Sequence, residues 1–255
     1  MDKIKTLTPQ QKKNVKMSNT LAQKSGYSLS VTEQKIMLLL ISKIKPTDSK
    51  LTFYDIPFTD YFKLVGISSP DGRSYAHIKK TFKALKDKSW WVKGYDEELG
   101  EVEMTYAWLD KVWIFKAGHI RVWIHSDMRP HLLELKKNFT EFELSIPLSM
   151  KSKYSIRLYE LLRSYKNLGK YTTQLEYLQE LLNADNYSSN TYDFFRWCLN
   201  PAVKEINDTS DLEVRMIKTH KIGSKKIVGV EFTIKEEMYP EIQMQMRADL
   251  IGEEA

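Results

Sequence analysis

The sequence has a single cysteine, Cys198, in 255 residues, and it has no long apolar run. One cysteine excludes a disulfide framework within the chain, a paired-cysteine zinc site and an iron–sulfur cluster. The longest apolar run, Ile36–Ile41, is far shorter than the ~20 residues that span a bilayer. The start of the chain is rich in Lys and Gln and has no apolar signal core. We therefore expect a cytoplasmic protein with no membrane partner.

The charge of the chain is unevenly distributed. The formal net charge is +6, with 42% hydrophobic and 28% charged residues, a composition typical of a globular protein. Residues 1–126 hold 21 Lys and Arg against 13 Asp and Glu, a net of +8, whereas residues 127–255 hold 18 against 20, a net of −2. A basic balance indicates an acidic partner such as nucleic acid, although charge that serves only solubility has the same sign.

The expected elements follow the same order in the two halves of the chain. Each half is predicted to form a helix, a short strand, two more helices and further strands, which is the plan of a winged helix. Two apolar triplets coincide at an offset of 121 residues: Ile78, Phe82 and Leu85 with Leu199, Val203 and Ile206. We therefore predict an α+β protein made of two tandem winged-helix domains related by pseudo-symmetry.

The same patterns predict the domain boundaries. The expected parts are a flexible basic N-terminal arm over 1–27, a first winged-helix domain over 28–126, a connector over 127–145, a second winged-helix domain over 146–235 and an acidic tail over 236–255. Two capping boxes, Ser30–Glu33 and Thr173–Glu176, predict helix starts, because in this motif each side chain bonds the backbone N–H of the other residue.

The second domain has the side chains that read bases. A helix-turn-helix places the N-terminal part of its second helix in the major groove, where Asn pairs with adenine and Arg with guanine. The candidate DNA-binding residues there are Ser188, Ser189, Asn190, Tyr192 and Arg196. A purely structural alternative is that Ser189 and Asn190 cap the helix. Phe194, Trp197 and Leu199 are assigned to the core, and Pro201 is expected to kink or end the helix.

A basic hairpin follows that helix. Lys221, Lys225 and Lys226 surround a Gly-containing turn between two alternating strands, and they are predicted to bind phosphates as the wing of the domain. Lysine at a sheet edge also prevents aggregation, so the same pattern has a structural explanation.

The first domain carries its positive charge on a helix. Arg73, Lys79, Lys80 and Lys83 are expected to contact the DNA backbone from its second helix. Its expected wing tip, Gly94–Glu101, is acidic, and phosphate would repel it. Protein–protein contact, including self-association, is therefore predicted as a second role of this domain beside backbone contact by its helix, and DNA contact through its wing stays open.

Three segments resemble theta-type plasmid replication initiators of the Rep_3 type, which have two winged-helix domains. Leu29–Ile41 is similar to the first helix of that family, Phe194–Asn207 is similar to its signature in the second domain, and so is the stretch from Asp211–Val214 to Val230–Ile234. The Leu-x-Pro-Ala-x-x-Glu-Ile-Asn string is the most specific part of the match.

The resemblance implies a function and a set of partners. It implies binding to double-stranded origin DNA at direct repeats (iterons), duplex opening, recruitment of the host initiator and replicative helicase, and a switch between initiating monomers and self-repressing dimers that limit copy number. By this pattern the region Ser188–Arg196 and the wing lysines read the repeat, and the first domain dimerises. The resemblance also implies a bacterial, non-enzymatic protein that needs no cofactor.

Two alternatives were weighed. A rolling-circle initiator nicks DNA with a tyrosine and needs a metal site, usually His-hydrophobe-His. The five histidines never have that spacing, and a GxxxxGK[ST] phosphate loop is also missing, so neither metal-dependent nicking nor ATP hydrolysis is expected. The closer alternative is a winged-helix transcriptional repressor without an initiator role, which the protein sequence does not separate from an initiator.

Overall fold

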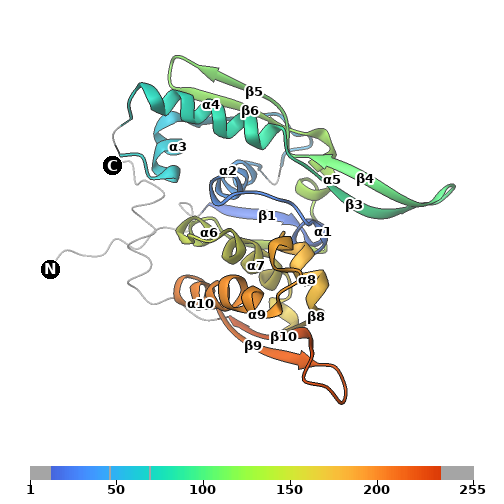
Figure 1. The fold of residues 1–255 in the computed structure, drawn as a ribbon. Helices are drawn as coiled ribbons and strands as arrows, with labels where there is room; N and C mark the ends of the chain where they lie inside the picture. The colour runs from blue at the N-terminus through green and yellow to red at the C-terminus, as the bar shows by residue number, and fades with distance from the viewer. Residues whose placement is uncertain (1–12, 46, 69, 237–255) are drawn as a thin grey trace.

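The computed structural model describes residues 13–45, 47–68 and 70–236 (Figure 1). The part of the expected arm before residue 13 and the acidic tail from residue 237 lie outside the described residues. Among the helices of these three ranges, none is long and apolar enough to cross a membrane.

Two three-stranded antiparallel sheets have the same strand order. The first contains β2 (Phe53–Pro57), β6 (His119–Ile124) and β5 (Leu109–Phe115), with β6 in the centre. The second contains β8 (Lys170–Gln174), β10 (Ile227–Glu236) and β9 (Leu212–His220), with β10 in the centre. In both sheets the first strand along the chain pairs with the last one. The prediction of two winged-helix units related by pseudo-symmetry is therefore confirmed.

Each unit also has the three helices of the predicted plan. The first unit contains α2 (Val31–Ile41), α3 (Phe58–Val65) and α4 (Gly72–Lys86). The second contains α7 (Lys153–Ser164), α8 (Leu175–Leu181) and a composite helix of α9 (Thr191–Asp193), η5 (Phe194–Leu199) and α10 (Asn200–Thr209). Both apolar triplets lie in the core, where only Val203 is partly exposed.

One of the two predicted capping boxes is present. The Glu33 amide donates to Ser30 Oγ at 3.3 Å and the Ser30 amide donates to Glu33 Oε2 at 2.7 Å, so α2 begins as expected. The box at Thr173 is absent. Thr173 lies in β8 opposite Val230, and α8 begins after Gln174 without a side-chain cap. Because α8 begins at Leu175, its N-cap is Gln174, and Thr173 lies one position too early to cap the helix.

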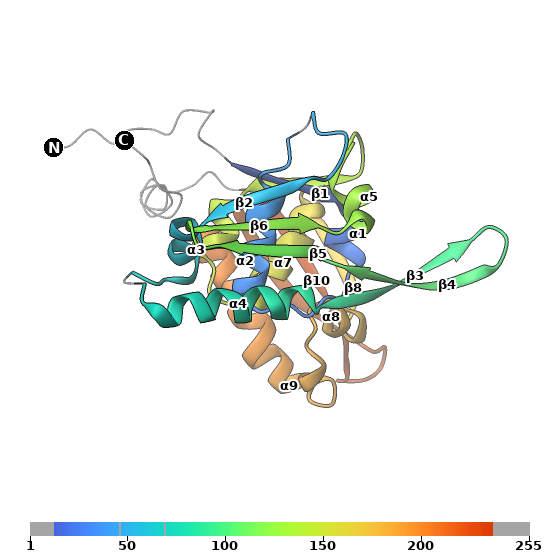
Figure 2. The ribbon, with the colours of Figure 1, turned by 90° about the horizontal axis from the view of Figure 1, so that it is seen from above.

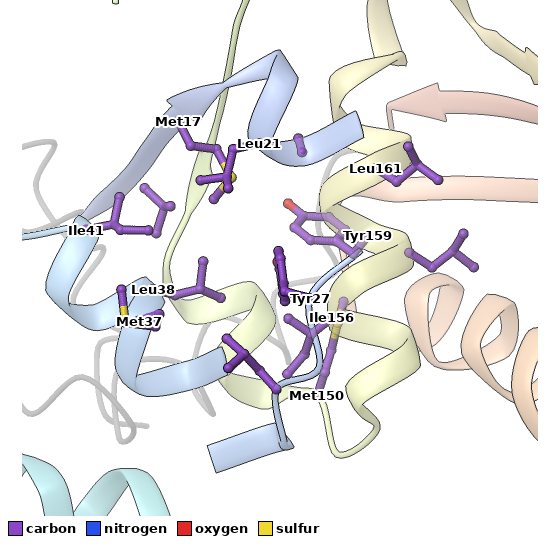
Figure 3. Close-up of a cluster of buried hydrophobic side chains, with 14 of the residues drawn as sticks. Met17, Leu21, Tyr27, Met37, Leu38, Ile41, Met150, Ile156, Tyr159 and Leu161 are labelled. Carbon is purple, nitrogen blue, oxygen red and sulfur yellow. The ribbon is translucent and has the colours of Figure 1, made fainter. Parts of the chain in front are cut away.

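The structure differs from the flexible arm expected over 1–27. Residues Asn14–Ser18 form β1, which pairs antiparallel with β7 (Phe139–Glu143), and α1 (Asn19–Lys24) follows directly. Val15, Met17 and Leu21 are almost fully buried, and this burial fixes the segment against the rest of the chain. Figure 3 shows Met17 and Leu21 among the core side chains of α2 and α7.

A buried arginine also anchors this segment. Arg157 of α7 donates from Nη1 to the Ala22 carbonyl oxygen at 2.8 Å, and from Nη2 to the carbonyl oxygens of Ser25 at 2.8 Å and Leu21 at 3.4 Å. It also pairs with Glu160, which accepts a hydrogen bond from the Tyr27 hydroxyl at 2.6 Å. Arg157 thus satisfies carbonyl groups at the end of α1 that would otherwise be buried without donors.

The expected connector is ordered and belongs to the core. It contains β7 and, in whole or in part, three short helices: η2 (Ser126–Met128), α5 (Arg129–Leu132) and α6 (Ser145–Ser149). Two further short helices flank β8 and α8: η3 (Lys166–Leu168) and η4 (Asp185–Tyr187). Helix α7, which was assigned to the second domain, packs against α1, α2 and β7 and also against α10. The two units therefore share one continuous core around α7.

An additional β-hairpin lies between α4 and the first sheet's β5–β6 hairpin, and it corrects the expected position of the first wing. Strands β3 (Ser89–Asp96) and β4 (Gly100–Ala107) pair only with each other and extend away from the body (Figures 1 and 2). By strand order, the equivalent of the β9–β10 wing is the β5–β6 hairpin, whose turn is Lys116–Gly118. The acidic turn within Gly94–Glu101 therefore belongs to an additional hairpin, which we call the arm (residues 89–107).

Candidate nucleic-acid interface

The composite helix 191–209, called here the recognition helix, runs through Pro201 without ending. Proline has no N–H to donate, so an α-helical bond to the Trp197 carbonyl is impossible. The preceding residues adopt a π-helical turn, in which the Asn200 amide donates to the carbonyl of Phe195 instead of Arg196. The helix therefore does not end at Pro201, and a π segment, a feature often found at functional sites, precedes the proline.

Trp197 lies outside the core, in which the sequence analysis had placed it. Phe194 and Leu199 are buried as predicted, and so is Phe195, but Trp197 is 55% exposed. The buried residues of this segment recur at spacings of three and four along one helix face, and Trp197 lies off that face. The Arg196 guanidinium lies 4.6 Å from the Trp197 ring, so a cation and an aromatic ring are exposed together on this helix.

The polar residues before the helix are exposed. Asn190 is the N-cap, because its Oδ1 accepts from the Asp193 amide at 3.1 Å and its Nδ2 donates to Asp193 Oδ2 at 2.8 Å. The capping role predicted as one alternative is therefore confirmed for Asn190. Ser188, Ser189, Tyr192 and Arg196 are exposed on the same segment, and their contact with DNA remains a prediction.

The wing of the second unit is an ordered hairpin. The Lys221 amide donates to the Lys226 carbonyl at 2.9 Å, the Ser224 amide donates to the Lys221 carbonyl at 3.0 Å, and Gly223 has a positive φ of 72°. Lys221, Lys225 and Lys226 are all exposed at the tip. Lys218 approaches the buried Phe195 ring to 4.3 Å and links the wing to the recognition helix; sequence periodicity did not single it out.

Gly229 holds the base of this wing. An added Cβ would lie 2.4 Å from the Thr173 carbonyl oxygen and 2.8 Å from Thr219 Oγ1. Gly229→Ala is therefore expected to lower the free energy of unfolding by about 1–3 kcal/mol through strand displacement, measured by thermal denaturation. Gly72→Ala is the matched control, since no atom lies within 4 Å of its added Cβ. Equal stability of the two variants would contradict the close approach.

The basic residues of the first unit lie on the outer face of α4. Ile78, Phe82 and Leu85 bury the inner face, and Lys79, Lys80 and Lys83 are exposed. Arg73 is exposed too, but its Nε donates to the N-cap carboxylate of Asp71 at 2.9 Å. Figures 1 and 2 show α4 and α9 in different layers, yet both on the side of the molecule opposite β1. Helix α4 and the start of the recognition helix therefore face one side of the molecule.

The remaining candidates for chemistry are accounted for by packing. Cys198 is 1% exposed, and burial raises the pKa of its thiol, as expected for a core residue. Within the described residues, no group of three or more His, Cys, Asp and Glu side chains is placed to hold a metal ion. Two winged-helix units, one with an exposed basic helix and the other with a lysine-rich wing, define a DNA-binding protein.

Comparison with known families identifies which DNA-binding protein this is. A family model described as the WH1 domain of an initiator replication protein matches residues 14–163, and a model described as the WH2 domain of an initiator Rep protein matches residues 174–234. The chain therefore belongs to the Rep3 family of plasmid replication initiators. The WH1 match begins at β1 and includes α7, in agreement with the contacts of these two elements.

Individual relatives are distant. A replication initiation protein of Escherichia coli is 24% identical over 244 residues, which cover 89% of this chain and 73% of the relative. Among solved structures, the match to domains 2-3 of RctB has 12% sequence identity and a TM-score of 0.41. It covers 85% of this chain and 83% of the RctB chain. The WH1 domain of MSBI1.176, a replication protein isolated from a multiple sclerosis patient, is 14% identical, covers 38% of this chain and 72% of its own, and gives a TM-score of 0.29.

Proposed function

We propose that this chain binds repeated duplex sites (iterons) at a plasmid origin, promotes opening of the duplex and recruits the host initiator and replicative helicase. As a dimer it represses its own gene. It acts in the bacterial cytoplasm and performs no catalytic step itself. The observation that carries the proposal is the recognition helix, because its exposed side chains suit base edges and its neighbouring wing suits phosphates.

The recognition helix supports sequence reading. Tyr192, Arg196 and Trp197 are exposed over its first two turns, while the opposite face is buried in the core. Arg forms bidentate bonds to guanine, and an aromatic ring can contact the methyl group of thymine. The pair formed by Arg196 and Trp197 therefore suits adjacent bases in a major groove, and Trp197 joins the candidate residues found from the sequence.

The wing and α4 are the elements that we assign to phosphate binding. The wing lysines lie on a short turn whose backbone is held by two hydrogen bonds, so the positions of their Cα atoms are set before they bind. Lys79, Lys80 and Lys83 offer three exposed cations on one helix face, and charge of this kind positions a protein on DNA without reading its sequence. The second domain thus selects the site, and the first adds affinity.

Footprinting on the DNA that flanks the gene tests the proposal. An initiator is expected to protect tandem repeats of about 20 base pairs, two helical turns each, beside an A·T-rich tract. A single protected palindrome without repeats would favour the alternative, a winged-helix transcriptional repressor without an initiator role. Absence of any protected site would contradict specific DNA binding altogether.

Arg196→Ala is expected to weaken specific binding about 5- to 150-fold and non-specific binding much less. One bidentate base contact gives about 1–3 kcal/mol of discrimination, and that range corresponds to this change in affinity. Fluorescence anisotropy on the protected duplex and on a scrambled duplex measures both. Arg215→Ala is the control, because Arg215 is an exposed cation paired with Glu213 on β9. Equal losses on the two duplexes would remove Arg196 from base reading.

A further inference from the structure

The outer face of the first sheet carries a row of aromatic rings. The side chains of Phe53, Trp113 and Phe115 are 44%, 50% and 38% exposed, and Trp123 is half-buried. The ring centroid of Trp123 lies 5.7 Å from that of Phe53 and 4.7 Å from that of Trp113. The Phe115 ring continues the row, 6.3 Å from Trp113. Alternate residues of the same strands, such as Val122, are buried in the core, so the rings project from the opposite face.

No described helix or strand covers this aromatic face. Figure 2 views the first sheet from above, and β2, β6 and β5 lie in front of the helices of the molecule. Figure 1 shows the same sheet at the top of the molecule and the β9–β10 wing at the bottom. A molecule bound to the aromatic face therefore lies at the opposite end of the chain's fold from the wing.

Cations lie among the rings. The guanidinium carbon of Arg121 is 3.9 Å from the centre of the Phe53 ring, and the two carboxylate oxygens of Asp55 accept hydrogen bonds from it at 2.8 Å each. Lys111 lies opposite Trp123 in the β5–β6 register, with its Nζ 5.3 Å from that ring. Among the described residues no ion pair engages Lys111, so its charge is available to a ligand, whereas that of Arg121 is neutralised.

Further cations stand at both ends of the aromatic row. A cavity of about 420 Å³ adjoins Trp123, and the exposed side chains of Lys50 and Arg129 line it together with one acidic residue, Asp110. At the other end of the row, Lys116 is exposed in the turn that joins β5 to β6. The face thus offers flat rings in its middle and positive charge along its length.

This combination suits single-stranded DNA and does not suit a duplex. In a duplex the bases are stacked on each other, and only their edges are accessible in the grooves. An unpaired strand exposes the faces of its bases, on which aromatic rings stack with little regard to sequence, while cations hold the phosphates. In nucleic-acid-binding modules built on a sheet, the aromatic residues of the strands stack about two or three bases in this way.

We infer that the outer face of the β2–β6–β5 sheet is a binding site for single-stranded DNA. Its bases stack on the aromatic row, and its phosphates contact Lys111 and Lys116. The site is separate from the recognition helix, and it reads no sequence. Its use in the cell rests on the proposed function, because opening of the origin duplex supplies the unpaired strand that this face holds. The binding itself does not rest on that function.

Removal of two rings tests the site. Trp113→Thr/Phe115→Thr takes away stacking surface but keeps residues that favour strands. The full chain with this change is expected to bind a fluorescein-labelled oligothymidylate about 5- to 150-fold more weakly, the effect of one lost stacking contact. Fluorescence anisotropy measures it in an excess of unlabelled duplex, which occupies the wing and α4. An abasic strand of the same length and charge is expected to bind both chains equally.

Two further variants complete the test. Trp91→Thr/Tyr95→Thr is the matched control, because it also removes two exposed rings from a strand, in the arm, and it is expected to leave oligothymidylate binding unchanged. Lys111→Gln/Lys116→Gln is expected to lower the slope of log affinity against log salt concentration by about 1.4, or about 0.7 per lost phosphate contact. Cross-strand ring pairs also stabilise a sheet, so circular dichroism and thermal denaturation check that each variant is folded.

Four outcomes would overturn the inference. They are an unmodified chain that does not bind oligothymidylate at low salt, a loss in Trp113→Thr/Phe115→Thr no larger than in the control, an equal loss for the abasic strand, and an unchanged salt slope in Lys111→Gln/Lys116→Gln. Tighter binding of oligouridylate than of oligothymidylate would overturn the assignment to DNA. Footprinting on duplex DNA is a separate measurement. A chain that binds the single strand and protects no duplex site contradicts the proposed function alone.

Discussion

Arg157→Met is expected to lower the free energy of unfolding by about 3–5 kcal/mol, because it removes one partner of a buried ion pair. The Arg157 side chain is 2% exposed, and Glu160 is 1% exposed. Methionine fills much of the same space, but it leaves the carbonyl groups of Leu21, Ala22 and Ser25 without their donor. It also leaves the buried Glu160 carboxylate without its cation, with only the Tyr27 hydroxyl as donor. Urea denaturation followed by circular dichroism measures the loss.

The pair itself is tested by a second substitution. Glu160→Gln removes the charge and still accepts from the Tyr27 hydroxyl, so Arg157→Met/Glu160→Gln is expected to recover part of the stability. A loss below about 1 kcal/mol in Arg157→Met would contradict the anchoring role given to this residue.

The cost of Arg157→Met is expected to grow as pH rises. Burial raises the pKa of Glu160, and the charge of Arg157 opposes that rise. Without Arg157 the folded-state pKa of Glu160 lies still further above its unfolded value. The contribution of protonated Glu160 to the stability of the variant is then fully present below its unfolded-state pKa, and it is lost as pH rises through its folded-state pKa. If the difference in the free energy of unfolding between Arg157→Met and the unmodified chain does not change with pH, other groups stabilise the charged Glu160 in the variant.

Neutralising the wing is expected to have the largest effect on DNA binding. In Lys221→Gln/Lys225→Gln/Lys226→Gln, the slope of log affinity against log salt concentration is expected to fall by about 0.9 per lost phosphate contact, or about 2.7 for three contacts. The affinities for specific and scrambled duplexes should fall together, since phosphates carry no sequence information. Anisotropy titrations over a range of salt concentrations measure the slope.

The control for the wing uses lysines on another side of the molecule. Lys136 and Lys137 are exposed between α5 and β7, and the carbonyl of the next residue, Asn138, accepts from the Asn19 amide directly after β1. Figure 2 shows β1 and α5 on the side away from α4 and α9. Lys136→Gln/Lys137→Gln is expected to leave the slope unchanged. If the slope of log affinity against log salt concentration is unchanged in the wing variant, the β9–β10 hairpin does not contact phosphates.

The order of helices and strands could be predicted because it is encoded locally. The capping box at Ser30 needs only residues three positions apart, and the apolar triplets on α4 and on the recognition helix follow helical spacing. The β1–β7 pair could not be predicted in this way. Asn14 and Glu141 are 127 residues apart, and nothing in a five-residue strand indicates a partner so distant.

Two features of the candidate site could not be predicted from the local sequence: the position of the first wing and the exposure of Trp197. Two hairpins follow α4, and only the pairing of β6 with β2 reveals that β5–β6 is the wing and that the acidic hairpin is additional. Trp197 was assigned to the core with Phe194 and Leu199, but its side chain is 55% exposed. Its position off the face of the buried helix residues, and not its apolar character, decides that it is available for binding.

The pairing of β1 with β7 has a consequence for folding during synthesis. Strand β1 is made among the first residues of the chain, yet its partner strand comes about 127 residues later. At 5–20 residues per second, β1 waits roughly 6–25 s for this partner on the ribosome. Its apolar residues Val15 and Met17 are exposed during that time, and Arg157 emerges later still. The N-terminal segment is therefore among the last parts of the first unit to acquire its native contacts, although it is synthesised first.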